Sequence, residues 1–147
     1  MTPDDGRTAG GGFAPLFFAW LVALGATLGA LFVGEVMGQA PCVLCWYQRI
    51  AMFPLAVILG IACLRADTAI HWYALPFVVI GAGFAVWHVL VYFDAFPTAI
   101  EPCTQGASCR GGDMTILGGM PLPLLSLGAF VAIGTLLVVA KWRESRE

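Results

Sequence analysis

Four long stretches of the chain carry almost no charge, and they constrain its fold more than any other feature. Residues 8–34, 68–93 and 114–140 contain no Asp, Glu, Lys or Arg, and residues 36–64 contain only Arg49. A helix needs about 20 apolar residues to cross the roughly 30 Å hydrocarbon core of a bilayer, and each stretch is longer than that. We therefore predict an all-α integral membrane protein with a bundle of four transmembrane helices.

The expected helices cover nearly the whole sequence, at residues about 13–36, 43–64, 72–93 and 120–142. One long connection remains, at about 94–119, so residues 1–147 are expected to form a single membrane domain. The first apolar segment exceeds the 7–15 residues of a signal-peptide core, and Asp4 and Asp5 offset the one basic residue before it, Arg7. We interpret this segment as a true first helix.

The basic residues are distributed unequally between the two sides of the membrane. Four spans place both termini on one side, with five of the seven basic residues: Arg7, Arg65, Lys141, Arg143 and Arg146. The positive-inside rule then predicts cytoplasmic termini and outward-facing connections at 36–42 and 94–119. A net charge of −2 without a basic stripe excludes a nucleic-acid partner.

The five cysteines divide into two pairs and a single residue. Cys42 and Cys45 lie at the outer end of the second helix, and Cys103 and Cys109 lie in the outer loop. Cys63 follows far down the second helix, about 27 Å from Cys45 at 1.5 Å per residue, so it cannot pair with the others. Structural disulfides and a Cys₄ zinc site are alternatives. A C-x-x-C at a helix start is more typical of redox chemistry, so we expect no metal.

The surroundings of the C-x-x-C favour a thiolate. Pro41 suits the first turn of a helix, and Cys42 and Cys45 are expected in that turn. Unpaired backbone N–H groups and the helix dipole stabilise negative charge there. Arg49 follows Cys45 by one helical turn on the same face and adds a positive charge.

Several polar residues lie at a similar depth in the outer half of the membrane, namely Glu35, Gln48, Arg49 and His88. Charged residues inside a membrane are costly and usually mark function. Arg49 could instead reach the interface or pair with Glu35, and His88 could simply bond to a neighbouring helix. Together they could line a small pocket beside the cysteines. No haem, flavin or nucleotide motif is visible, so a lipid-soluble quinone is the expected electron carrier.

Three sequence motifs resemble the disulfide bond formation protein B (DsbB) family, most closely its small BdbC-type branch. They are PCVLCWYQR at residues 41–49, Glu101-Pro102-Cys103 with Cys109, and PLLSL at residues 123–127. The pattern P-C-x-L-C-x-Y-x-R before an apolar run is specific, whereas C-x₅-C alone would be weak. The resemblance covers roughly residues 30–135, with the same number and order of helices.

The resemblance implies a relay of thiol exchanges in a bacterial cytoplasmic membrane, with the redox cysteines facing outward. Cys103 and Cys109 would exchange with an extracytoplasmic thioredoxin-fold thiol oxidase. Cys42 and Cys45 would reoxidise that loop pair and pass two electrons to the membrane quinone pool, ubiquinone or menaquinone. Cys45 would contact the quinone, and Arg49 and His88 would contribute to its binding site.

Other functions fit some of the same features. A small proton-coupled transporter would use four spans and the acidic Glu35, but its cysteines would have no task. A structural membrane protein stapled by disulfides would keep both cysteine pairs oxidised. A reductase of the vitamin K epoxide type would use similar parts with electrons flowing in the opposite direction, which depends on reduction potentials.

Overall fold

The computed structural model describes residues 11–95, 109, 115–116 and 119–146. Its helices, in chain order, are α1 (Phe13–Leu31), the π-helical turn η1 (Phe32–Val36), α2 (Val43–Arg65), the 3₁₀ turn η2 (Thr68–Ile70), α3 (His71–Tyr92) and α4 (Leu122–Glu144). Two short antiparallel strands, β1 (Thr115–Ile116) and β2 (Met120–Pro121), lie immediately before α4.

The predicted fold class is confirmed. In the described part of the chain, four helices are long and apolar enough to cross a membrane: Phe13–Val36, Val43–Arg65, His71–Tyr92 and Leu122–Glu144. Their bounds lie within two residues of the predicted ones. The last helix begins later than predicted because Met120 and Pro121 pair with β1, and Pro123 then occupies the first turn of α4, where a missing N–H donor costs nothing.

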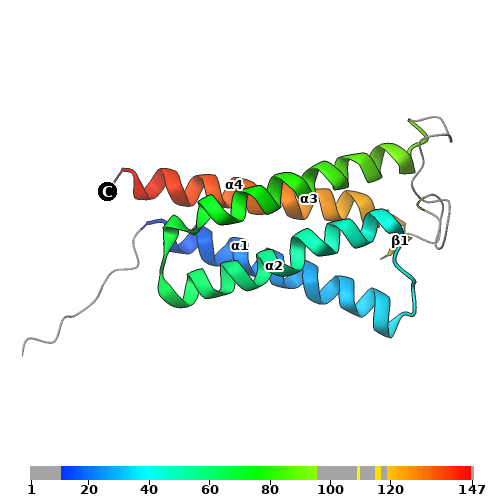
Figure 1. The fold of residues 1–147 in the computed structure, drawn as a ribbon, viewed down its shortest axis with the longest axis horizontal. Coiled ribbons are helices and arrows are strands. Elements are labelled where there is room, and N and C mark those ends of the chain that lie inside the picture. Colours follow the sequence, from blue (N-terminus) through cyan, green and yellow to red (C-terminus); the bar gives the residue numbers. More distant parts are fainter. Residues whose placement is uncertain (1–10, 96–108, 110–114, 117–118, 147) are drawn as a thin grey trace, which may run out of the picture.

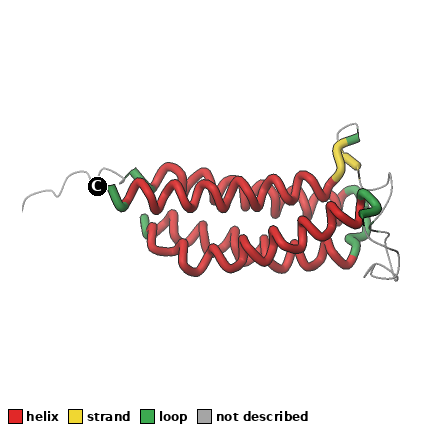
Figure 2. The backbone as a smooth tube through the Cα atoms, turned by 90° about the horizontal axis from the view of Figure 1, so that it is seen from above, coloured by secondary structure: helices red, strands yellow, loops and turns green. Residues whose placement is uncertain are grey.

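The four helices form an elongated bundle in which each one packs against two others (Figures 1 and 2). α1 and α3 each contact both α2 and α4. The beginning of α1 and the end of α4 lie at one end of the bundle, and the beginning of α2 lies at the other, near the β1–β2 pair (Figure 1). The cysteine-bearing start of α2 is therefore at the end remote from the described ends of the chain.

The bundle is apolar both inside and outside, as expected for a protein surrounded by lipid. Its interior is packed with fully buried side chains such as Leu16, Leu55, Leu59 and Phe130. Large apolar residues also face outward along the helices, as Leu64 does with 90% of its surface exposed. α3 and α4 approach closely at Gly81, where an added Cβ would overlap the Phe130 ring. Small residues at such crossings allow helices to pack in a membrane.

Candidate functional site

Cys42 caps the N-terminus of α2. Its backbone is extended (φ −68°, ψ 168°), and its Sγ accepts a hydrogen bond from the Cys45 N–H at 3.2 Å. The helix begins at Val43, where the predicted span begins, but Cys42 is its capping residue and does not lie in the first turn as expected. Only Cys45 lies in that turn. The Cys42 sulfur thus satisfies one of the N–H groups that a helix start leaves unpaired.

The two sulfurs of the C-x-x-C are close together but differ in their surroundings. They lie 2.7 Å apart and share a hydrogen bond. Cys42 is fully buried, whereas Cys45 is half-buried. The hydrogen bond to Cys45, together with burial, raises the pKa of the Cys42 thiol. The Cys42 thiol therefore gives up its proton less readily than an ordinary cysteine.

His88 of α3 contacts Cys42, the first cysteine of the C-x-x-C. Its ring is buried, with Nε2 3.8 Å from the Cys42 Sγ and Nδ1 3.1 Å from the Gln48 side-chain nitrogen. Because the Gln48 amide donates to Nδ1, the ring proton is on Nε2 and points toward Cys42. The sequence placed His88 near the cysteines by depth alone, and the structure shows it in direct contact with one of them.

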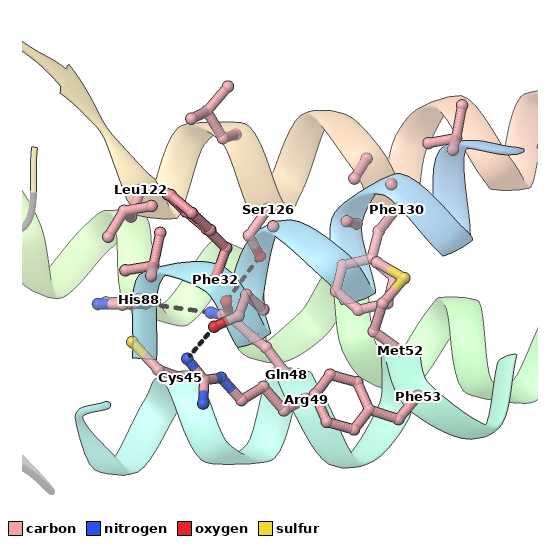
Figure 3. Close-up of a pocket in the computed structure, with 18 of the residues that line it drawn as sticks. Phe32, Cys45, Gln48, Arg49, Met52, Phe53, His88, Leu122, Ser126 and Phe130 are labelled. Atoms are coloured by element: carbon pink, nitrogen blue, oxygen red, sulfur yellow. Dashed lines mark hydrogen bonds between the residues drawn. The ribbon is translucent and has the colours of Figure 1, made fainter. Parts of the chain in front are cut away.

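Gln48 connects three helices through its side-chain amide (Figure 3). Its nitrogen donates to His88 and, at 3.5 Å, to the Phe84 carbonyl of α3, while its Oε1 accepts from the Ser126 hydroxyl of α4 at 2.6 Å. In the sequence, Gln48 stands out only for its depth and Ser126 only as part of a motif. Two polar residues near one end of otherwise apolar helices were the available signal for this network.

Arg49 is held against α1. Its Nη2 donates to the Ala30 carbonyl at 2.8 Å, and its guanidinium lies 5.7 Å from the centre of the Trp46 ring. A Cβ at Gly34, in the π-turn η1, would come within 3.3 Å of both terminal nitrogens, so glycine permits this approach. The carbonyl and the aromatic ring offset part of the cost of a charge at this depth.

A cavity of about 1100 Å³ opens beside Cys45 among α1, α2 and α4 (Figure 3). Cys45, Gln48, Arg49 and His88 gather at one end of it, and most of the other lining residues are apolar. A pocket of this kind suits a flat apolar molecule that carries hydrogen-bonding groups at one end. Of the four polar residues expected to line a small pocket, Gln48, Arg49 and His88 border this large and mostly apolar cavity, whereas Glu35 is not among its lining residues.

The remaining cysteines fall into different positions. Cys109 is disulfide-bonded and fully buried, and it packs in one cluster with Cys42, Cys45 and Val91. The predicted partner in the loop pair, Cys103, lies outside the described residues. Cys63 is a free, half-buried cysteine near the opposite end of α2. The structure thus brings a loop cysteine to the C-x-x-C. Cys63 lies apart from both, as its spacing along the helix predicted.

Comparison with known proteins identifies the family. The model of the family "Disulfide bond formation protein DsbB" matches residues 14–140. The chain belongs to the DsbB family. Among its relatives, a probable disulfide formation protein of Metapseudomonas resinovorans is 57% identical over 131 residues, which are 88% of this chain and 91% of the relative. Disulfide bond formation protein C of Bacillus subtilis (strain 168) is 40% identical over 130 residues, 88% and 94% of the two chains.

Membership of the DsbB family confirms the resemblance seen in the motifs. A probable disulfide formation protein of Deinococcus radiodurans adds a further relative, 42% identical over 140 residues and 89% of each chain. No solved structure matches the chain. As a DsbB-family member with four membrane-spanning helices, the protein is a membrane-embedded disulfide oxidoreductase that acts in disulfide bond formation by oxidising thiols.

Proposed function

We propose that this DsbB-family protein reoxidises an extracytoplasmic thioredoxin-fold thiol oxidase and passes the electrons to ubiquinone or menaquinone. The observation that carries the proposal is the position of the C-x-x-C. Cys42 packs with the loop residue Cys109 on one side, and Cys45 lines the cavity on the other. A dithiol in this position can receive electrons from the loop and release them toward the membrane.

Two thiol–disulfide exchanges would carry the electrons inward. In the first, the two thiols of the partner reduce a Cys103–Cys109 disulfide and themselves become a disulfide. In the second, the loop dithiol reduces the Cys42–Cys45 disulfide and is reoxidised. Each exchange transfers two electrons and two protons between one dithiol and one disulfide, and it needs no other reagent. A disulfide-bonded Cys109 with free Cys42 and Cys45 is the combination expected after the second exchange.

The geometry supports different tasks for the two sulfurs. Cys42, buried beside Cys109, would exchange with the loop, and Cys45, at the cavity wall, would face the electron acceptor. Attack of the loop thiol on Cys42 would release Cys45 as the first thiolate. When Cys42 then leaves its mixed disulfide with the loop, the His88 Nε2–H is in position to donate to the negative charge on the Cys42 sulfur. Arg49 provides a fixed positive charge one turn from Cys45.

The cavity fits a quinone. Its largely apolar wall suits the ring substituents and isoprenoid tail, and Arg49 at its polar end can donate to a ring oxygen. A bound quinone supplies an acceptor for two electrons and two protons. Arg49 and His88 would orient that acceptor beside Cys45, and the buried position of the site would keep water from the sulfurs. These are the roles that we assign to the cofactor-binding residues.

The proposed setting is the bacterial cytoplasmic membrane, with residues 1–147 as one four-helix domain and both termini in the cytoplasm. The described chain ends lie together at one end of the bundle, and Lys141 and Arg143 are in the last turn of α4 at that end. Under the positive-inside rule this end is cytoplasmic. The C-x-x-C then faces the oxidising compartment, where disulfides persist.

The test is reduction of quinone by purified protein in detergent, with a reduced thioredoxin-fold oxidase as electron donor. Soluble analogues of ubiquinone and menaquinone serve as acceptors. We expect Cys103→Ser and Cys109→Ser to block oxidation of the partner while Cys42 and Cys45 still respond to quinone, and Cys63→Ser to behave as wild type. If the protein reduces neither quinone analogue, the proposed acceptor is wrong. If Cys103→Ser or Cys109→Ser still oxidises the partner, the proposed relay is wrong.

A further inference from the structure

Three atoms of the kind that bind thiophilic metal ions converge at the start of α2. The sulfurs of Cys42 and Cys45 and a ring nitrogen of His88 all lie within 4.8 Å of one another. Two cysteines and one histidine form a known zinc ligand set that leaves a fourth position open. We propose that the reduced form of this site binds one Zn²⁺ through Cys42, Cys45 and the Nε2 of His88.

Small movements would complete the coordination geometry. With Zn–S and Zn–N bonds of about 2.3 and 2.05 Å, a tetrahedral site places its two sulfurs about 3.8 Å apart and sulfur and nitrogen about 3.6 Å apart. Cys42 Sγ and His88 Nε2 are already separated by 3.8 Å. The two sulfurs, now 2.7 Å apart, must separate by about 1 Å. Cys45 borders the cavity and has room to turn.

The hydrogen-bond network around His88 can support this coordination. A metal on Nε2 requires the ring proton on Nδ1, where Gln48 now donates. A half-turn of the Gln48 amide would present Oε1 to that proton and its nitrogen to Ser126, whose hydroxyl can accept as well as donate. Ligating histidines usually donate their second N–H to such a partner, which fixes the ring and strengthens binding.

The charge balance also favours binding at this buried position. Two thiolates, one Zn²⁺ and a neutral imidazole sum to zero, so the complex adds no net charge to the site. Formation of the complex releases the thiol protons and involves no change of oxidation state. A Cys42–Cys45 disulfide offers no thiolates, so Zn²⁺ would bind the reduced form alone. On the proposed function, bound zinc would hold the enzyme reduced and compete with its oxidation by quinone, whereas the binding itself requires neither quinone nor partner.

The experiment measures zinc binding directly. The full chain with Cys63, Cys103 and Cys109 replaced by Ser is reduced without oxygen, freed of reductant and titrated with Zn²⁺ against a chromophoric chelator. We expect one Zn²⁺ per reduced chain and none after Cys42 and Cys45 have been oxidised. If circular dichroism shows that this variant has lost helix, the reduced wild-type chain is compared with its Cys42→Ser variant, which should bind one ion fewer.

Two further variants separate this site from a simple pair of thiols. His88→Ala should weaken Zn²⁺ binding at least tenfold, and Gln48→Leu should weaken it by about 10–100-fold through loss of the supporting hydrogen bond. Thr135→Ala is the control, because its hydroxyl bonds only within α4, to Val131, away from the site. Absence of stoichiometric zinc, or equal affinity in His88→Ala, would overturn the inference. Zinc binding by a protein that cannot reduce quinone would support the inference and overturn the proposed function instead.

Discussion

At the scale of single residues, the two cysteines of one C-x-x-C occupy unlike environments. Cys42 caps the helix and is buried against His88 and Cys109, whereas Cys45 lies within the first turn and borders the cavity. Cys42 precedes the first turn of α2 and Cys45 lies within it, and the elements packed around α2 bury Cys42 but leave Cys45 beside the cavity. The same short motif can therefore face a loop disulfide with one sulfur and a membrane pocket with the other.

The raised pKa of Cys42 predicts a pH dependence of its alkylation. Since only the thiolate reacts, Cys42 in the reduced protein should be alkylated slowly at neutral pH, and its rate should rise as pH increases toward its pKa. The variant Cys45→Ala lacks the hydrogen bond and the negative charge of the neighbouring sulfur. The pKa of Cys42 should therefore fall, and Cys42 should be alkylated faster at a given pH. Mass spectrometry of the peptide after timed alkylation gives the rates. Fast alkylation of Cys42 at neutral pH in the wild type would contradict the prediction.

Arg49 allows a test of the proposed quinone site at one residue. In Arg49→Gln we expect an apparent KM for quinone about tenfold higher, equivalent to about 1.4 kcal/mol, because the fixed charge at the cavity wall is lost. Arg49→Lys should lose less, since it keeps the charge but lacks the planar group that reaches both the Ala30 carbonyl and a ligand.

Steady-state quinone reduction measures both Arg49 variants. The matched control is Arg65→Gln, which removes an arginine from the last turn of the same helix and should leave the KM unchanged. Wild-type quinone kinetics in Arg49→Gln would reduce the role of Arg49 to anchoring α2 on α1.

At the scale of elements, small residues set how closely the helices approach at two points. Gly34 in the π-turn η1 leaves space for the Arg49 guanidinium, so α1 and α2 meet through a charged contact at the polar end of the cavity. Gly81 leaves space for the Phe130 ring, so α3 and α4 meet through an apolar contact in the core. In a membrane, where lipid is as apolar as the core, such packing contributes much of the attraction between helices.

The α3–α4 contact predicts the effect of one methyl group. Gly81→Ala should destabilise the bundle by about 1–3 kcal/mol, because the new Cβ overlaps the buried Phe130 ring and forces the helices apart. Gly83→Ala, two residues along the same helix with nothing within 4 Å of its added Cβ, should be neutral or slightly stabilising.

Denaturant unfolding of both variants in detergent, followed by circular dichroism, measures this difference. Adding Phe130→Leu to Gly81→Ala should recover part of the lost stability, since a smaller side chain accommodates the methyl group. Equal stability of Gly81→Ala and Gly83→Ala would contradict the close approach of α3 and α4.

At the scale of the whole molecule, the bundle has two chemically different ends. One end carries Cys42, Cys45 and the polar network, and the other carries cations stacked on aromatic rings, with Lys141 4.5 Å from the Trp72 ring centre and Arg146 3.7 Å from that of Trp142. Aromatic and basic residues gather at membrane interfaces, and basic residues favour the cytoplasmic one. This asymmetry leads to a prediction about orientation.

The orientation can be tested with single cysteines in a cysteine-free variant. Met37→Cys lies on an exposed position just after η1, and Ser145→Cys lies on an exposed position just after α4, at the opposite end of the bundle. A membrane-impermeant maleimide added to intact spheroplasts should label Met37→Cys, and it should label Ser145→Cys only after lysis. The reverse labelling pattern would place the redox cysteines in the reducing compartment and remove the basis for the relay.

The positions of the four helices were predictable from the sequence alone. In a bilayer every backbone polar group must be paired within the span, so a long apolar stretch has almost no alternative to a helix. The C-x-x-C and the depth of Arg49 also follow from local spacing, because they depend on neighbours within one or two turns.

The contacts that make the candidate site depend on tertiary packing. His88 meets Cys42 across 46 residues of sequence, and Ser126 meets Gln48 across 78, and no local pattern specifies which faces of three apolar helices turn toward one another. Where nearly every residue is apolar, hydropathy marks the spans but not the faces that turn inward. Only the packed bundle decides that Gln48 joins the network and that Cys42 and Cys45 face different sides. The sequence by itself therefore determined that helices cross the membrane and where, and side-chain packing between them decided which polar groups meet.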